Sequence, residues 1–220
     1  MIKYFLSIIK KSIRYFSTPV VSLVSRLLYL VPVILLLLSC NSDYHPETHK
    51  KGYFKIDFPE KKYQVFDQPG YPYTFEYPVY ANIIKDTTFF EAKPENPWWI
   101  NIDVPRFAGR IYISYKDIGS RNNLDTLIND AFKMAYKKHS DIATGITDSL
   151  MKTPNNVEGL YFNLAGNTAT ANQFFLTDST KHFLRGALYF DAAPNADSLG
   201  IVNDFLKKDL QHLINTLHWK

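Results

Sequence analysis

Short segments of alternating apolar and polar residues dominate the chain from residue 52 onwards. Alternation with a period of two is typical of half-buried strands. It predicts a first group of strands at Tyr53–Phe58, Tyr73–Tyr77, Trp99–Val104 and Arg110–Lys116. A proline follows each of the first three, and a strand stops there because proline lacks the N–H that the ladder needs. Since only residues 105–109 separate the last two segments, we expect them to form a hairpin.

The period changes to that of a helix between residues 123 and 138. Apolar residues recur there at spacings of three and four, namely Leu124, Leu127, Ile128, Ala131 and Ala135. Asn122 or Asn123 can cap the start of this helix. The pattern therefore separates the first strands from a second group.

Four further strands are predicted at Ala143–Met151, Glu158–Ala165, Thr168–Thr177 and His182–Asp191. The Gly166-Asn167 pair predicts a two-residue hairpin turn between the second and third of them. The chain then ends in a predicted amphipathic helix, Leu199–Leu217, with its apolar stripe toward the core. Its polar residues Lys207, Lys208, Asp209 and Gln211 are expected on the outer side.

This order of elements predicts the α+β class, with an antiparallel β-sheet and helices packed across it. Strands joined by short turns pair antiparallel. PsbP/Mog1-like domains offer an analogy at the level of fold only. Because no repeat and no second boundary interrupts the pattern, we expect a single α+β domain over residues 52–220.

The first 39 residues have the pattern of an export signal: a basic stretch, an apolar run and then small residues. The apolar run Leu27–Leu38 is shorter than the roughly 20 residues of a spanning helix. We predict a lipoprotein signal peptide over residues 1–39. Because its basic region is long, either translation starts downstream of Met1 or the leader is unusual.

The sequence Leu37-Leu38-Ser39-Cys40 resembles a bacterial lipobox, in which the cysteine becomes the first mature residue and is acylated, for example with palmitate. Cys40 is the only cysteine of the chain and is the predicted lipid attachment site. Two or three acyl chains anchor a protein firmly, since each buried CH₂ contributes about 0.8 kcal/mol. A cysteine buried in a signal-anchor helix is the alternative. Residues 40–51 are predicted to form the lipidated cysteine and a flexible tether, which contains His45 and His49.

The net charge of +4 belongs to the leader rather than to the domain. Five of the 25 basic residues and none of the 21 acidic ones lie in residues 1–39. Without them, 20 basic residues face 21 acidic ones and the net charge is −1. Nucleic-acid binding therefore loses its compositional support, and we expect no nucleic-acid partner.

Motifs for catalysis, cofactors or metals are missing from the sequence. Asp178, Ser179 and His182 contain the residue types of a hydrolase triad. They are nearly contiguous, however, and triad members normally converge from different elements. A hairpin turn capped by Asp178 is the preferred interpretation, and we predict neither an enzyme nor a cofactor.

Aromatic residues make up 15% of the chain and suggest a surface made for contact. Trp98 and Trp99 begin a predicted strand and should point to opposite faces, so that one enters the core and the other is exposed. With Tyr71 and Tyr73 they are candidate contacts for a partner or a glycan. Core packing and strand-edge anchoring are the preferred explanation for the two tryptophans.

Five Asp-Ser or Asp-Thr pairs, beginning at Asp86, Asp125, Asp148, Asp178 and Asp197, resemble the O-glycan acceptor pattern of exported Bacteroidetes proteins. Such pairs are also typical of turns and helix starts. Both interpretations stay open.

Several long blocks resemble the gliding-motility lipoprotein family GldD of Bacteroidetes. They are GYFKIDFPEKKY (52–63), PYTFEYPVYA (72–81), WWINIDVPRFAGRIYISYK (98–116), QFFLTDSTKHFLRGALYF (173–190) and the terminal LINTLHWK. The resemblance implies a component needed for surface gliding and for the associated type IX secretion apparatus. It implies lipid attachment at Cys40 and brings no catalytic residues.

The leading hypothesis is a non-enzymatic, lipid-anchored envelope protein that docks on motility or secretion subunits. The alternative is a glycan- or peptidoglycan-binding module that uses Trp98 or Trp99 and the nearby tyrosines. Surface-exposed Bacteroidetes lipoproteins tend to carry an acidic stretch after the cysteine, and here only Asp43 is acidic. We therefore expect the periplasmic side of the outer or inner membrane.

Overall fold

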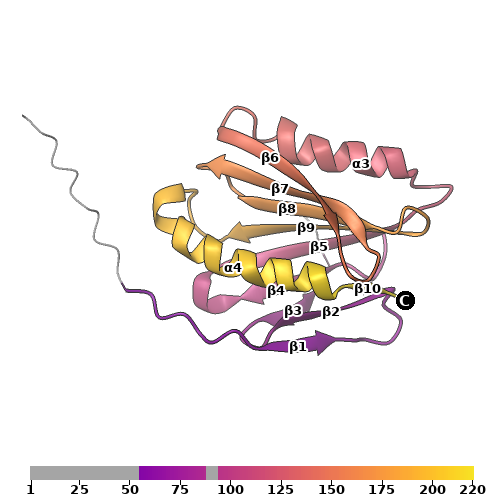
Figure 1. Ribbon diagram of the computed structural model, residues 1–220, viewed down its shortest axis with the longest axis horizontal. Coiled ribbons are helices and arrows are strands. Elements are labelled where there is room, and N and C mark those ends of the chain that lie inside the picture. Colours follow the sequence, from indigo (N-terminus) through magenta and orange to yellow (C-terminus); the bar gives the residue numbers. More distant parts are fainter. Residues whose placement is uncertain (1–54, 88–93) are drawn as a thin grey trace, which may run out of the picture. The chain divides into compact units, whose positions relative to one another are not determined.

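Two antiparallel sheets organise the computed structural model, which describes residues 55–87 and 94–220 (Figure 1). The larger sheet has the strand order β3-β4-β5-β9-β8-β7-β6. Its strands are β3 (Asn82–Lys85), β4 (Ile100–Val104), β5 (Gly109–Asp117), β6 (Ala143–Lys152), β7 (Glu158–Gly166), β8 (Asn172–Thr177) and β9 (His182–Phe190). The smaller sheet has the order β1-β2-β10, with β1 (Tyr63–Phe66), β2 (Tyr73–Pro78) and β10 (His218–Trp219).

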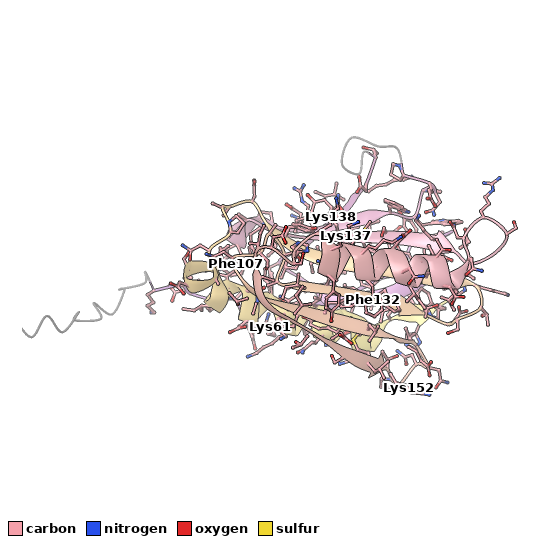
Figure 2. All side chains as sticks on the ribbon, turned by 90° about the horizontal axis from the view of Figure 1, so that it is seen from above. Lys61, Phe107, Phe132, Lys137, Lys138 and Lys152 are labelled. Atoms are coloured by element: carbon pink, nitrogen blue, oxygen red, sulfur yellow. The ribbon has the colours of Figure 1, made fainter. Side chains whose placement is uncertain are left out.

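Two helices pack on opposite faces of the larger sheet. Helix α4 (Ala196–Thr216) crosses one face (Figure 1), where it shares the main apolar core with the smaller sheet. Helix α3 (Leu124–Phe132) continues into a π-helical turn, η2 (Lys133–Lys137), and packs on the other face, as Figure 2 shows from above. A short 3₁₀ turn, η1 (Pro105–Phe107), connects β4 to β5.

Strand β5 shows how alternation in the sequence produces these two faces. Ile111, Ile113 and Tyr115 are buried in the core beneath α4, whereas the intervening side chains are half-buried on the opposite face. Successive side chains of a strand point to opposite faces. Each alternating segment therefore supplies both the core and the second surface.

Asparagines cap both helices at their N-termini. The Asn123 side chain accepts a hydrogen bond from the backbone N–H of Asp125, and the Asn195 side chain accepts one from that of Ser198. An N-cap acceptor satisfies one of the backbone donors that the first helical turn leaves free. These caps fix where the helices begin.

The structure confirms the predicted α+β class with antiparallel strands and packed helices. It corrects the expectation of one sheet, because β1, β2 and β10 form a separate sheet. The strand predicted at Tyr53–Phe58 is wrong within its described part, residues 55–58, which is irregular. Its alternation instead reflects side-chain packing, since the Phe58 ring stacks on Phe205 of α4 with centroids 4.4 Å apart.

The two-residue hairpin predicted at Gly166-Asn167 is also wrong, because β7 ends at Gly166 and β8 begins only at Asn172. The longer connection is held by two buried threonines. The Thr168 hydroxyl donates to the carbonyl of Thr170, and the Thr170 hydroxyl donates to that of Asn172. Side chains thus satisfy loop carbonyls that a tight turn would have paired within the ladder.

The predicted leader, Cys40 and the tether lie outside the described residues and stay predictions. All elements given above belong to one compact unit, Phe54–Lys220. Among the helices within the described ranges, none is long and apolar enough to cross a membrane.

Candidate functional site

One half of the larger sheet carries polar side chains on the face opposite α4. The register aligns Asn101 with Tyr112, and Tyr112 with Ala187. Ala187 in turn lies opposite Gln173, so a single row crosses four strands. Side chains of directly opposite residues share a face. We call this surface the polar face; it consists of Asn101, Asp103, Arg110, Tyr112, Gln173, Arg185 and Tyr189.

Helix α3 covers the neighbouring part of the same sheet face. Its buried residues Leu127 and Ala131 pack against phenylalanines of β7, β8 and β9, namely Phe162, Phe175 and Phe183. Within the described ranges, this cluster includes no residue of β3, β4 or β5. The polar face therefore begins where the contact with α3 ends.

Arg185 is the central cation of the polar face. Its Nη2 atom donates to Gln173 Oε1 at 2.6 Å. Burial lowers the pKa of its guanidinium, and the neighbouring Tyr189 opposes that shift. None of the ion pairs formed among residues 55–87 and 94–220 involves Arg185. A guanidinium removed from water without a carboxylate is costly, so this arrangement favours binding of an anionic group.

Two amide side chains of the polar face, Gln173 next to Arg185 and Asn101 two strands away on β4, have buried polar atoms without a partner among the described residues. Gln173 is 1% exposed and Asn101 is 8% exposed. Gln173 Nε2 and Asn101 Oδ1 have no hydrogen-bond partner among the residues that the structure describes. An unsatisfied buried polar atom costs about 1–3 kcal/mol. The row therefore contains one buried donor and one buried acceptor that the described residues leave unsatisfied.

A cleft of about 460 Å³ lies at the end of the polar face next to the β4–β5 turn. Asp103, Arg110, Tyr112 and Tyr189 line it together with the backbone around Gly109. Arg110 donates from both Nε and Nη2 to Asp103 Oδ1, each at 2.9 Å, and its charge is therefore neutralised. The volume falls in the range of ligand pockets.

A second polar cluster joins α4 to the first two strands. Asp209 is 2% exposed and accepts hydrogen bonds from Tyr63 at 3.0 Å and from Tyr80 at 2.5 Å. Lys61 Nζ forms an ion pair with the same carboxylate at 2.6 Å and lies 3.2 Å from the ring centroid of Phe205. This paired cluster is structural, whereas the described residues supply no acidic partner for Arg185.

Asp209 corrects a sequence prediction. Its position next to Lys208 indicated the solvent side of the helix, but the structure buries it. Burial raises the pKa of Tyr63 to about 12, and the Asp209 carboxylate adds to that shift. Burial also lowers the pKa of Lys61, which the ion pair with Asp209 opposes. Helical spacing alone does not reveal partners that are 129 residues or more away in the sequence, here Tyr63 of β1 and Tyr80 of the turn after β2.

Asp178, Ser179 and His182 do not form a triad. Asp178 Oδ1 accepts hydrogen bonds from the backbone N–H groups of Thr180, Lys181 and His182 at 2.8–3.0 Å. These bonds lower the pKa of Asp178 to about 2, against the opposing effect of burial. The imidazole of His182 instead lies 2.6 Å from the hydroxyl of Tyr115. The preferred interpretation of this segment as a capped turn agrees with this geometry.

The structure brings together the four aromatic candidates Tyr71, Tyr73, Trp98 and Trp99, but largely inside the core. Tyr73 and Trp99 are buried, so the expectation that they offer contact surface is wrong for these two side chains. Tyr73 donates to the carbonyl of Trp98, and Trp99 Nε1 donates to that of Tyr115 at 2.7 Å. Tyr71 and Trp98 are half-buried, and their role as contacts stays a prediction.

The aromatic content reflects the core rather than an exposed surface. Every Phe, Tyr and Trp within residues 55–87 and 94–220 is buried or half-buried. The exposed large hydrophobic side chains there are aliphatic or Met. No group of three metal-ligating side chains occurs in those ranges either. Cys40, His45 and His49 lie outside them.

Sequence reasoning missed the polar face because its members are spread over four strands. Gln173 stands near the start of β8, just before its apolar residues, and Arg185 interrupts the apolar residues of β9. A polar residue inside an otherwise buried strand was the available signal, since such a residue needs a partner. Only the register shows that these residues lie beside one another.

Comparison with known protein families identifies the class of this protein, which is that of the envelope lipoproteins. Residues 41–219 match the family described as gliding motility lipoprotein GldD. Because the match covers more than half of the chain, the chain belongs to this family. It therefore has a gliding-motility role and is associated with a membrane.

Among solved structures, the fold is similar to that of cyanobacterial PsbP (CyanoP) from Synechocystis sp. PCC 6803. The identity is 11% and the TM-score is 0.41, with 74% of this chain and 95% of that chain covered. A similarity at this level carries no functional argument. No curated protein matches the chain.

Proposed function

We propose that this protein is a non-enzymatic, lipid-anchored component that docks onto other proteins of the gliding and type IX secretion machinery through its polar face. Membership of the family supplies the gliding role. The link to type IX secretion and the docking role go beyond family membership and are part of the proposal. Lipid attachment at Cys40, on the periplasmic side of the envelope, belongs to the same proposal.

The observation that carries the docking role is Arg185, a cation for which the described residues supply no carboxylate, on a sheet face that also contains two unsatisfied amides. In the isolated domain, Arg185 lacks a carboxylate among the described residues, and Gln173 Nε2 and Asn101 Oδ1 lack partners. A natural fold keeps such a costly set mainly where a bound group completes it. The carboxylate of a docked partner segment would supply the acidic partner of the half-buried Arg185.

The chemistry of the polar face indicates the kind of partner. A carboxylate can form a bidentate pair with an arginine, which is stronger than a neutral hydrogen bond. The rings of Tyr112 and Tyr189 pack edge to face with centroids 5.5 Å apart beside the cleft. Tyr and Arg are enriched in protein interfaces. An acidic side chain on an extended partner segment fits this combination.

In-cell photo-crosslinking tests the proposal. A benzophenone amino acid replaces Tyr112, which lies on the polar face, or Tyr77, a half-buried residue of β2 outside it. We expect envelope proteins of the motility or secretion machinery to be captured from position 112 and not from position 77. Equal capture at both positions, or none at 112, would overturn docking through this face.

Glycan binding gains no support from the described surface, because none of its aromatic side chains is exposed. Sugar sites normally need an accessible ring for stacking. We therefore expect the protein to remain in the supernatant when it is incubated with purified cell wall. Retention on the cell wall would favour the alternative of a glycan- or peptidoglycan-binding module.

A further inference from the structure

Strand β6 forms an edge of the larger sheet, and its outer side carries no further strand among the described residues (Figure 1). The strand is ten residues long and contains no proline. Most of its side chains are exposed, and Leu150 is 89% exposed. Soluble proteins normally shorten, cover or interrupt such an edge, because it can pair with another strand. Strand β6 is therefore available for pairing along its length.

One backbone hydrogen bond just after β6 shows which N–H and C=O groups of this strand face outward. The N–H of Thr153 donates to the carbonyl of Val157 at 2.9 Å, so this opposed pair is a hydrogen-bonded one. Opposed pairs alternate along an antiparallel ladder between hydrogen-bonded and non-hydrogen-bonded ones. The N–H and C=O groups of Asp148, Leu150 and Lys152 therefore point away from β7.

The hydrogen bonds of β7 lead independently to the same assignment of the outward backbone groups of β6. The N–H of Leu164 in β7 donates to the carbonyl of Ala171, on the side of β8. Even-numbered residues of β7 thus bond to β8, and odd-numbered ones bond to β6. Because Leu150 is opposite Leu160, an even-numbered residue, its backbone groups are left for the open edge.

We propose that β6 pairs with β6 of a second copy of this chain, antiparallel about a two-fold axis at Leu150. In this register Leu150 faces Leu150 of the partner subunit. Asp148 faces Lys152 of the partner subunit, and the symmetry repeats that ion pair on the other side of the axis. The outward N–H and C=O groups of all three positions are opposed, as a hydrogen-bonded ladder requires.

Charge complementarity selects this register among those that keep outward groups opposed. An axis at Asp148 or at Lys152 would place like charges directly opposite each other, which destabilises a sheet. An axis at Ser149 or Met151 would place a charged side chain opposite Leu150. The axis at Leu150 pairs opposite charges and buries the most exposed large apolar side chain of the described residues.

Intrachain contacts already hold both charged side chains in place. The Tyr136 hydroxyl donates to Asp148 Oδ1 at 2.5 Å, and Lys152 Nζ lies 2.9 Å from Glu158 Oε1. Lys152 stands at the periphery of the molecule (Figure 2). Preorganised side chains lose less entropy on association. The carboxylate of Asp148 retains a second oxygen for the partner's lysine.

Disulfide trapping in the native envelope tests the register. The full-length chain carries Leu150→Cys; the Cα atoms of a hydrogen-bonded antiparallel pair are about 5.5 Å apart, within the range of disulfides. We expect a covalent dimer on a non-reducing gel. The controls are wild type, with Cys40 alone, and Thr144→Cys, an exposed position on the same strand. The proposal would be overturned if Leu150→Cys formed no covalent dimer, or if Thr144→Cys formed as much covalent dimer as Leu150→Cys.

A charge exchange in the detergent-solubilised full-length protein tests it independently. Asp148→Lys replaces two attractive pairs by two repulsive ones, and we expect the dimer dissociation constant to rise about tenfold or more. Asp148→Lys combined with Lys152→Asp restores the opposite charges and should bring the constant back to near the wild-type value. Analytical ultracentrifugation measures the dimer dissociation constants of wild type, Asp148→Lys and the double variant. A monomeric wild type, or a double variant no better than Asp148→Lys, would contradict the proposed interface.

Discussion

Lys61 Nζ lies 2.6 Å from Asp209 Oδ2, which ties the segment before β1 to helix α4. The pair is surrounded by hydrogen bonds from two tyrosines and by the ring of Phe205. It therefore stabilises the contact between the smaller sheet and the helix that covers the core. Its loss should affect folding rather than docking.

We predict that Asp209→Ala lowers the free energy of unfolding by about 3 kcal/mol, because it leaves a partly buried lysine and two tyrosines without their acceptor. Denaturant unfolding followed by tryptophan fluorescence measures the change. Asp204→Ala, at an exposed position of the same helix, should stay within about 0.5 kcal/mol of wild type. Equal effects of the two variants would show that the cluster does not stabilise the fold.

The Asp178 turn predicts a dependence of stability on pH. Three backbone N–H groups hold the pKa of Asp178 at about 2 in the folded protein, below its ordinary value of 3.8. The resulting stabilisation is present above the ordinary value and is lost as the pH falls through about 2. Because Asp178 is only half-buried, solvent screening reduces this stabilisation to about 1 kcal/mol.

We therefore expect Asp178→Ala to be about 1 kcal/mol less stable than wild type at pH 7, with a difference that shrinks steadily from pH 5 to pH 2. Urea unfolding at several pH values measures it. Asp191→Ala removes an exposed carboxylate at the end of β9 and should show no such convergence. A difference for Asp178→Ala that does not change with pH would contradict the role of its charge.

The polar face predicts a variant that is more stable than the natural protein. Arg185→Met together with Gln173→Leu removes the unpaired guanidinium and the unsatisfied amide in side chains of similar size. We expect the free energy of unfolding to rise by about 1 kcal/mol. A fall of more than about 1 kcal/mol would show that the two residues stabilise the isolated fold.

Gly159 predicts a backbone constraint at the centre of the larger sheet. A Cβ atom there would lie 1.9 Å from the carbonyl oxygen of Phe175, a backbone atom that cannot rotate away. We expect Gly159→Ala to lower the free energy of unfolding by about 3 kcal/mol, measured by thermal or urea unfolding. Gly145→Ala is the matched control on β6, because nothing lies within 4 Å of its Cβ position. Similar stability of the two variants would refute this constraint.

The elements with strong periodicity were predictable from the sequence. The alternation over β4 and β5 and the stripe of α4 each reflect burial of one face, which local spacing encodes. Strands β1, β3 and β10 were not predicted, because strands of two to four residues carry too little pattern. The irregular segment at residues 55–58 has the alternation of a strand, but only Phe58 packs on α4, and Ile56 is exposed.

The candidate site was less predictable, because it depends on contacts between distant residues. The turn at Asp178 could be inferred, since all of its hydrogen bonds are local. The burial of Tyr73 could not, because it depends on how the smaller sheet, to which Tyr73 belongs, packs into the main core. The meeting of Gln173 with Arg185 likewise depends on the register between β8 and β9.

Docking through the polar face is most directly tested by gliding itself. The double variant Arg185→Met with Gln173→Leu replaces the natural gene at its own locus, and immunoblots of membrane fractions measure its amount. We predict a normal level of membrane-bound protein together with loss of gliding on agar. Normal gliding by cells that contain only this variant would contradict the account.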